Sequence, residues 1–206
     1  MFEFDKEAAL EGAKTGGSYI NESGVYKGKL TKVYAFESKS GTKGIGFEFE
    51  SDDGQKANFD LYYKKANGEQ IFGYNRVQSI MAVTKTRSFG ERVDCTVTRF
   101  KKEADVKCFP AIEGKKIQIA FQKTLVTGVD GGEYENLDYV ASFNYDTGQA
   151  ADEQLEDKPA KRIESVKAML ERNPVKDKRK PVSIPKTAGV TDDDDGFPFE
   201  DDDVPF

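Results

Sequence analysis

Residues 43–64 have the sequence KGIGFEFESDDGQKANFDLYYK, and this segment decides the fold. Hydrophobic side chains occupy alternate positions on both sides of Asp52-Asp53-Gly54, a combination typical of a tight turn. Because successive side chains of a strand point to opposite faces of a sheet, the pattern predicts two strands that each bury one face. The alternating residues are Ile45, Phe47 and Phe49 before the turn and Ala57, Phe59, Leu61 and Tyr63 after it. The segment therefore predicts an antiparallel β-hairpin.

The flanking segments add one strand before this hairpin, and a helix and two strands after it. Residues 19–36 predict a long strand or a pair of strands, and residues 74–81 carry hydrophobic side chains at helical spacing. Residues 116–126 and 137–143 alternate again, on either side of the glycine-rich turn at 127–132. Three strands, a helix and two strands form the element order of the OB-fold. We therefore expect a mainly β protein built on a five-stranded OB-fold barrel.

Two further elements lie outside a minimal barrel. Residues 5–14 favour a short helix, and residues 93–108 predict an extra hairpin around a basic turn. If this hairpin is centred on residues 101–102, Cys95 lies directly opposite Cys108. Two small apolar side chains packed on one face are the favoured interpretation, because the compartment is expected to be reducing. A disulfide is the less favoured one.

The composition divides the chain into three parts. Residues 1–145 form the expected OB-fold nucleic-acid-binding domain. Residues 146–191 lack a strand pattern and are expected to be a linker. Within this linker a short helix at 160–172 has hydrophobic residues at helical spacing, and the sequence leaves open whether it packs on the barrel or stays free. Residues 192–206 are expected to be a disordered acidic tail that docks other proteins.

The distribution of charge keeps nucleic acid among the candidate partners. The formal net charge of the chain is -6, but residues 192–206 contain eight acidic residues and no basic one, so residues 1–191 carry +2. Within that part, residues 155–186 contain ten Lys or Arg and five acidic residues. The low isoelectric point therefore describes the tail more than the rest of the chain.

The composition excludes several classes of catalytic and metal site. The chain has two cysteines and no histidine, which removes the usual zinc sites, histidine bases and Cys-His nucleophile pairs. The glycines and lysine at 41–46 lack the spacing of a phosphate-binding P-loop. We therefore expect a protein that is not an enzyme, with no catalytic residues, metal or cofactor. The chain shows no secretory pattern and no apolar run of membrane length, so we expect a cytoplasmic protein without membrane contact.

Lysines and aromatic residues are interleaved along the expected strands and loops, a composition typical of proteins that bind single-stranded nucleic acid. The cations contact phosphates while bases stack on aromatic rings, each stack contributing ~1–3 kcal/mol. The alternative is that the aromatic residues fill the core, and period-two spacing assigns Phe47, Phe49, Phe59, Phe121 and Phe143 to it. Acidic residues on the polar strand faces would repel phosphate, so we expect strand ends and loops to carry most of the binding. The candidate DNA-binding residues are Lys27, Lys29, Lys32, Tyr34, Phe36, Lys39, Lys43, Lys56, Tyr62, Lys64, Lys65, Arg99, Lys101 and Lys102.

The last seven residues have the sequence EDDDVPF. This stretch has the features of a peptide ligand. Its acidic residues would attract it to a basic surface, its aromatic side chain would fill a pocket, and a carboxylate would pair with an Arg or Lys. This stretch closely resembles the C-terminal tip of bacterial single-stranded DNA-binding proteins, and with the OB-fold element order the chain resembles the bacteriophage-type members of that family. The resemblance implies that the protein coats exposed strands during DNA replication, recombination or repair and recruits partner proteins through the tip. The docking residues that it implies are Asp201, Asp202, Asp203, Val204, Pro205 and Phe206.

Some alternatives stay open. Cellular members of the family usually carry stacking tryptophans and this chain has none, so the stacking residues and the assembly are undetermined, with a monomer or dimer favoured. The acidic tail has solubility as its alternative role. For the whole chain the alternative is an acidic adaptor or DNA-mimic protein that binds nucleic-acid-processing proteins without binding DNA. A metal-dependent nuclease is disfavoured, because an unstructured acidic tail does not hold two metal ions in place.

Overall fold

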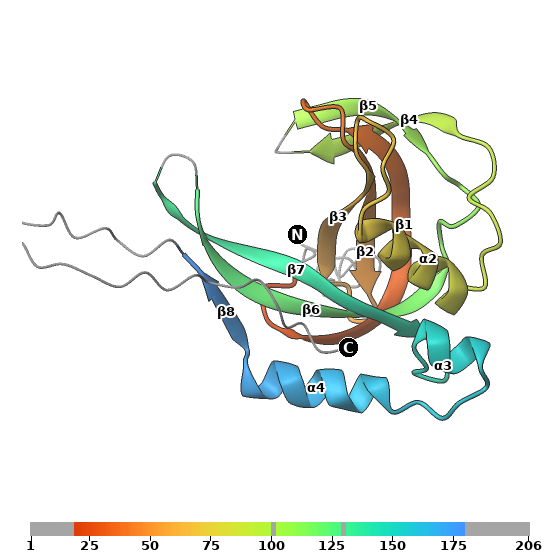
Figure 1. Cartoon of the computed structure of the whole chain (residues 1–206), viewed down its shortest axis with the longest axis vertical. Helices are drawn as coiled ribbons and strands as arrows, with labels where there is room; N and C mark the ends of the chain where they lie inside the picture. The colour runs from red at the N-terminus through yellow and green to blue at the C-terminus, as the bar shows by residue number, and fades with distance from the viewer. Residues whose placement is uncertain (1–18, 100–101, 129–130, 180–206) are drawn as a thin grey trace, which may run out of the picture.

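The computed structural model describes residues 19–99, 102–128 and 131–179 (Figure 1). This part of the chain is mainly β, with eight strands and three helices. The strands are β1 (Gly24–Glu37), β2 (Lys43–Ser51), β3 (Lys56–Lys64), β4 (Val93–Arg99), β5 (Lys102–Cys108), β6 (Lys116–Thr127), β7 (Glu133–Asn144) and β8 (Val175–Lys178). The helices are α2 (Gly73–Val83), α3 (Ala151–Leu155) and α4 (Arg162–Arg172). The helix expected at 5–14 and the tail expected at 192–206 lie outside the described residues.

β1, β2 and β3 form an antiparallel meander around the predicted hairpin. β2 and β3 meet at the predicted turn with Phe47 opposite Phe59, and the other edge of β2 pairs with β1. Alternate side chains of these strands face one core, as their spacing predicts. All five phenylalanines assigned to the core are buried, which confirms that prediction: Phe47, Phe49, Phe59, Phe121 and Phe143.

β1 also organises the second half of the sheet, because its other edge is divided between two partners. Residues 24–29 pair with β6, whereas Tyr34 and Ala35 pair with β5 of the β4–β5 hairpin. β6 pairs with β7 along its whole length, and beyond Phe121 its other edge pairs with β8 in parallel. Figure 1 shows the β6–β7 hairpin projecting away from the rest of the sheet, with β8 beside it.

The strands do not close into the expected five-stranded barrel. They form an open and mainly antiparallel sheet. Among the described residues, β3 and β7 are not joined by backbone pairing. The rings of Phe59 and Tyr139 stack between them with centroids 5.2 Å apart, and α2 contacts both strands. Val77 and Ile80 of α2 are buried in the same core. Side-chain packing therefore holds β3 and β7 together where a closed barrel would use backbone hydrogen bonds.

The residues that follow β7, expected to be a linker, instead pack on the sheet as far as residue 179. α4 falls within the range expected for a short helix, and its Ile163 and Leu170 are buried against Ala120 of β6 and Phe143 of β7. Burial of these apolar side chains stabilises the attachment, which corrects the linker assignment for residues 146–179. The folded region therefore extends past the boundary expected at residue 145.

One carboxylate fixes the starts of both α3 and α4. Glu153 is buried and accepts hydrogen bonds from the backbone N–H groups of Ala150, Lys161 and Arg162, at 2.8–2.9 Å. These N–H groups have no partner within their helices, so the side chain caps two helices at once. Burial alone would raise the pKa of Glu153, but these three donors and the nearby Arg162 side chain outweigh it and hold the pKa below its ordinary value.

The β4–β5 hairpin exists as predicted, but its register and its cysteines differ from the expectation. Arg99 pairs with Lys102, so Cys95 lies opposite Val106 and Cys108 lies opposite Val93. The two cysteines are diagonal neighbours with Cα atoms 5.9 Å apart, and they form a disulfide. That distance is within the range a disulfide spans, so the less favoured interpretation is the one that the structure shows.

Candidate nucleic-acid interface

A groove of about 880 Å³ lies between β3 and β7, where the sheet is open. β3 and β7 form its two walls, and β4, β8 and α2 contribute further side chains. Its volume is in the range of ligand-binding sites. The charged residues that line it are Arg76, Arg99, Lys176, Lys178, Asp60 and Asp138, and the aromatic ones are Tyr34, Phe59, Tyr62 and Tyr139.

Two glycines of β2 shape the wall formed by β3. Gly44 lies opposite Phe36 of β1, and Gly46 lies opposite Tyr34. A Cβ atom on Gly44 would lie 2.3 Å from the Phe36 ring, and one on Gly46 would lie 2.4 Å from the Tyr34 ring. Only glycine therefore lets these rings lie across β2. The Phe36 ring then contacts Tyr62 edge-on, with centroids 5.3 Å apart. Tyr62 lines the groove and is 42% exposed.

Arg99, the last residue of β4, packs over the same rings. Its guanidinium lies 3.9 Å from the centroid of the Phe36 ring and 5.7 Å from that of Tyr34. It also donates a hydrogen bond to the Asp60 carboxylate at 2.5 Å. Desolvation raises the pKa of Asp60, although Arg99 acts in the opposite direction. The ion pair thus fastens the β4–β5 hairpin to β3.

The opposite wall carries a similar pair. The Lys178 ammonium of β8 lies 2.8 Å from the Asp138 carboxylate of β7, and the buried Thr124 hydroxyl donates to the same carboxylate at 3.0 Å. Lys176 and Lys178 alternate along β8, so both face the groove. Every side chain of β8 is exposed, which leaves backbone pairing and ion pairs to hold the strand in place.

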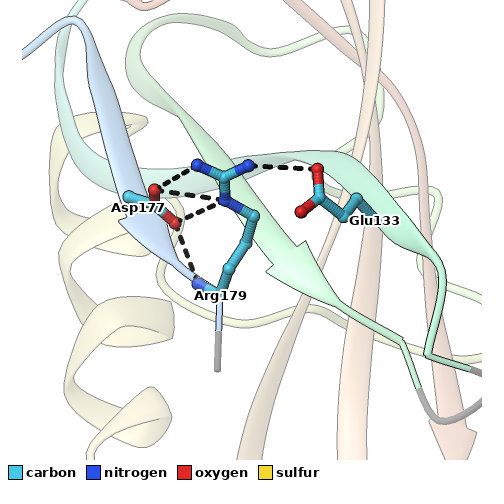
Figure 2. Close-up of polar contacts among 3 residues, drawn as sticks. All are labelled: Glu133, Asp177 and Arg179. Carbon is cyan, nitrogen blue, oxygen red and sulfur yellow. Dashed lines mark hydrogen bonds and ion pairs between the residues drawn. The ribbon is translucent and has the colours of Figure 1, made fainter. Parts of the chain in front are cut away.

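Figure 2 shows a second ion pair that ties β8 to β7. The Arg179 guanidinium donates to both carboxylate oxygens of Asp177 and lies 3.0 Å from the Glu133 carboxylate. The hydrogen bonds from Arg179 lower the pKa of Asp177 to about 2. Because Glu133 belongs to β7, this contact reaches across β6 and fixes the position of β8 on the projecting hairpin.

α2 supplies Arg76 to the groove. Phe72, just before the helix, is 68% exposed. The Arg76 guanidinium lies over two rings, 5.0 Å from the centroid of Phe72 and 5.6 Å from that of Tyr139. Tyr139 is buried, and desolvation raises its pKa to about 12. α2 therefore supplies the groove with a cation that lies over a buried ring of the β7 wall.

Three residues that the sequence analysis names as DNA-binding line this groove: Tyr34, Tyr62 and Arg99. Tyr34 is only 4% exposed, and desolvation raises its pKa to about 12. Its assignment as a stacking surface is therefore wrong, because its ring is covered by Arg99 and packs against Gly46. Phe36 is half-buried under Arg99 and positions Tyr62.

Lys27 and Lys29 of β1, two of the predicted lysines, lie on a different part of the sheet from the groove. Lys27 of β1 and Lys116 of β6 both approach the Tyr145 ring, with ammonium-to-centroid distances of 5.4 and 4.8 Å. Lys29 pairs with Glu50 at 3.3 Å. Neither Lys27 nor Lys29 lines the groove.

The remaining predicted lysines lie at strand ends and turns. Lys43 pairs with Lys64 one step beyond Tyr62, so both continue from that end of the β3 wall. Lys65 is bonded to Glu69, and Lys32 donates to the Thr96 carbonyl of β4. Lys39, Lys56 and Lys102 are exposed, and Lys101 lies outside the described residues.

Sequence reasoning missed three of the four cations that line the groove. Arg76 lies on the polar side of a helix assigned only to packing, and Lys176 and Lys178 lie in a segment assigned to the linker. The basic composition of residues 155–186 was the available signal for these lysines. That composition could not predict where the two lysines lie in the fold, because β8 is only four residues long and has no hydrophobic alternation.

No protein-family model matches the chain, and no curated protein matches its sequence. Among residues 19–99, 102–128 and 131–179, no three metal-ligating side chains cluster as a metal site would need. In the same residues, no helix is long and apolar enough to cross a membrane.

Proposed function

We propose that this protein binds single-stranded DNA, without strong sequence preference, in the groove between β3 and β7. The observation that carries the proposal is that one groove combines Tyr62, an exposed ring, with four cationic side chains. Single strands are held by these two kinds of contact together, because phosphates need cations and unpaired bases need rings. Neither kind of contact reads the identity of a base, so the binding tolerates sequence.

The fold adds support. The element order and the long β1 shared by both halves of the sheet are those of an OB-fold, and we infer that the chain has an open variant of it. In that fold nucleic acids bind across the second and third strands, which here carry Gly44, Gly46 and Tyr62. The protein would coat exposed strands during replication, recombination or repair, and residues 201–206 would dock partner proteins. It acts by binding and has no catalytic role in this proposal.

Fluorescence anisotropy with a labelled dT oligonucleotide tests the proposal. Tyr62→Ala removes an exposed ring from the groove and is expected to weaken binding by ~1–3 kcal/mol, or roughly 5- to 150-fold. Tyr19→Ala is the matched control, because Tyr19 is 66% exposed and does not line the groove. An equal loss of affinity in both variants would indicate that the binding site lies outside the groove. A wild-type protein that ignores the oligonucleotide would leave the acidic adaptor as the better function.

A further inference from the structure

Two carboxylates lie inside a groove that is otherwise suited to phosphate. Asp60 comes from the β3 wall and Asp138 from the β7 wall. Each one is paired with a cation from another strand, Arg99 at 2.5 Å and Lys178 at 2.8 Å. A phosphate that contacts Arg99 or Lys178 must therefore come close to the carboxylate that is already paired with that cation.

The first carboxylate is also next to the exposed ring. Asp60 and Tyr62 are two residues apart on β3 and pair with Gly46 and Gly44 without a register shift between them, so they lie on the same face. A base stacked on Tyr62 would then have Asp60 as its neighbour along the strand. The negative charge of Asp60 therefore lies beside the position that a stacked base would occupy.

Ligands differ in what they can present to these carboxylates. A single strand rotates about its backbone, so it can turn neutral bases towards Asp60 and Asp138 and direct its phosphates to Arg76 and Lys176, the groove cations outside these two ion pairs. A duplex has its bases paired inside and presents phosphates on its outer surface, and inorganic polyphosphate has no bases at all. These polyanions cannot avoid the two carboxylates, and like charges brought together cost binding energy.

We propose that Asp60 and Asp138 determine the specificity of the groove, by repelling polyanions that do not present accessible bases. The proposal rests on the proposed function and adds a discriminating element to it. Specificity is a difference between affinities, and a repulsive contact with the wrong ligand produces it as effectively as an attractive contact with the right one.

The test compares Asp60→Asn, Asp138→Asn and the double variant with the wild type. Asparagine still accepts a hydrogen bond, so Arg99 and Lys178 keep a partner while the charge is lost. Asp94→Asn is the matched control, because Asp94 pairs with Lys107 at 2.5 Å on the β4–β5 hairpin and does not line the groove. The probes are a dT oligonucleotide, a duplex of equal length and inorganic polyphosphate, each titrated at low and at moderate salt.

Each groove substitution is expected to raise the affinity for polyphosphate and duplex by about three- to tenfold at low salt, with less than about a twofold gain for the single strand. Asp60→Glu and Asp138→Glu retain the charge and are expected to retain the wild-type preference. This comparison separates charge from any structural effect of the substitution. Equal gains for single strand and polyphosphate, or a polyphosphate affinity no higher than that of Asp94→Asn, would overturn the proposal. Loss of the preference in the glutamate variants would overturn it too. A wild-type protein that does not bind the single strand would instead overturn the proposed function.

Discussion

Replacing Lys176 and Lys178 by alanine measures how much β8 contributes to DNA binding. Four cations line the groove, and these two lysines are the ones that β8 supplies. Arg76 and Lys176 are the groove cations that are not paired with Asp60 or Asp138. If each of them contacts one phosphate, the logarithm of the affinity for single-stranded DNA falls with the logarithm of salt concentration with a slope of about -1.4, at about -0.7 per contact. The double variant removes the contact of Lys176, so its expected slope is about -0.7.

The assay is a series of anisotropy titrations with a dT oligonucleotide over several salt concentrations. The side chains of β8 are exposed, so the substitutions are expected to change the free energy of unfolding by less than about 1 kcal/mol. Lys161→Ala with Lys167→Ala is the control, because it removes the same charge from exposed positions that do not line the groove. An unchanged slope would show that β8 does not contact phosphates. The same change in both double variants would show that only net charge matters.

Three further predictions concern parts of the chain outside the groove. Glu153→Gln is expected to lower the free energy of unfolding by about 2 kcal/mol in urea titrations, because a neutral side chain caps α3 and α4 less strongly. Since the pKa of Glu153 is lowered in the folded state, its contribution is present above the ordinary glutamate pKa and is lost as the pH falls through the lowered value, so the difference between wild type and variant should vanish in acid. Reducing the Cys95–Cys108 disulfide, whose cysteines are 13 residues apart, is expected to destabilise the protein by up to ~3 kcal/mol; an equal melting temperature with and without a dithiol would contradict this. Deleting residues 204–206 is expected to leave DNA binding intact and to abolish capture of replication and repair proteins; identical pull-downs from a bacterial lysate would argue against the docking role.

The central hairpin and the core were predictable because their signal is local. Alternation on both sides of Asp52-Asp53-Gly54 specifies the pairing of β2 and β3, and the same period assigns Phe47 and Phe59 to the buried face. Gly44 was visible in the sequence too, but only as a failed phosphate-loop motif. Its role depends on the Phe36 ring from another strand, a contact that no local pattern contains.

The groove was less predictable, because it depends on which elements meet in space. Tyr62, named for its position among lysines, is exposed and lines the groove. Tyr34, named in the same way, is buried, because the β4–β5 hairpin that covers it could not be placed from the sequence. Lys178 belongs to a strand whose side chains are all exposed, so it carries no burial pattern for a sequence to show. The disulfide was disfavoured for a different reason, since an expected reducing compartment outweighed the proximity that the hairpin gives Cys95 and Cys108.

The open side of the sheet has a consequence for the range of ligand sizes that the groove can accommodate. In a closed barrel, backbone hydrogen bonds fix the distance between neighbouring strands at about 4.8 Å. Here the distance between β3 and β7 is set by the ring stack of Phe59 on Tyr139. A contact between side chains yields at lower cost than a ladder of backbone bonds, since rotamers adjust singly. If the groove binds single-stranded DNA as proposed, the two walls can separate slightly for a purine and approach each other for a pyrimidine, which would give sequence tolerance a mechanical origin.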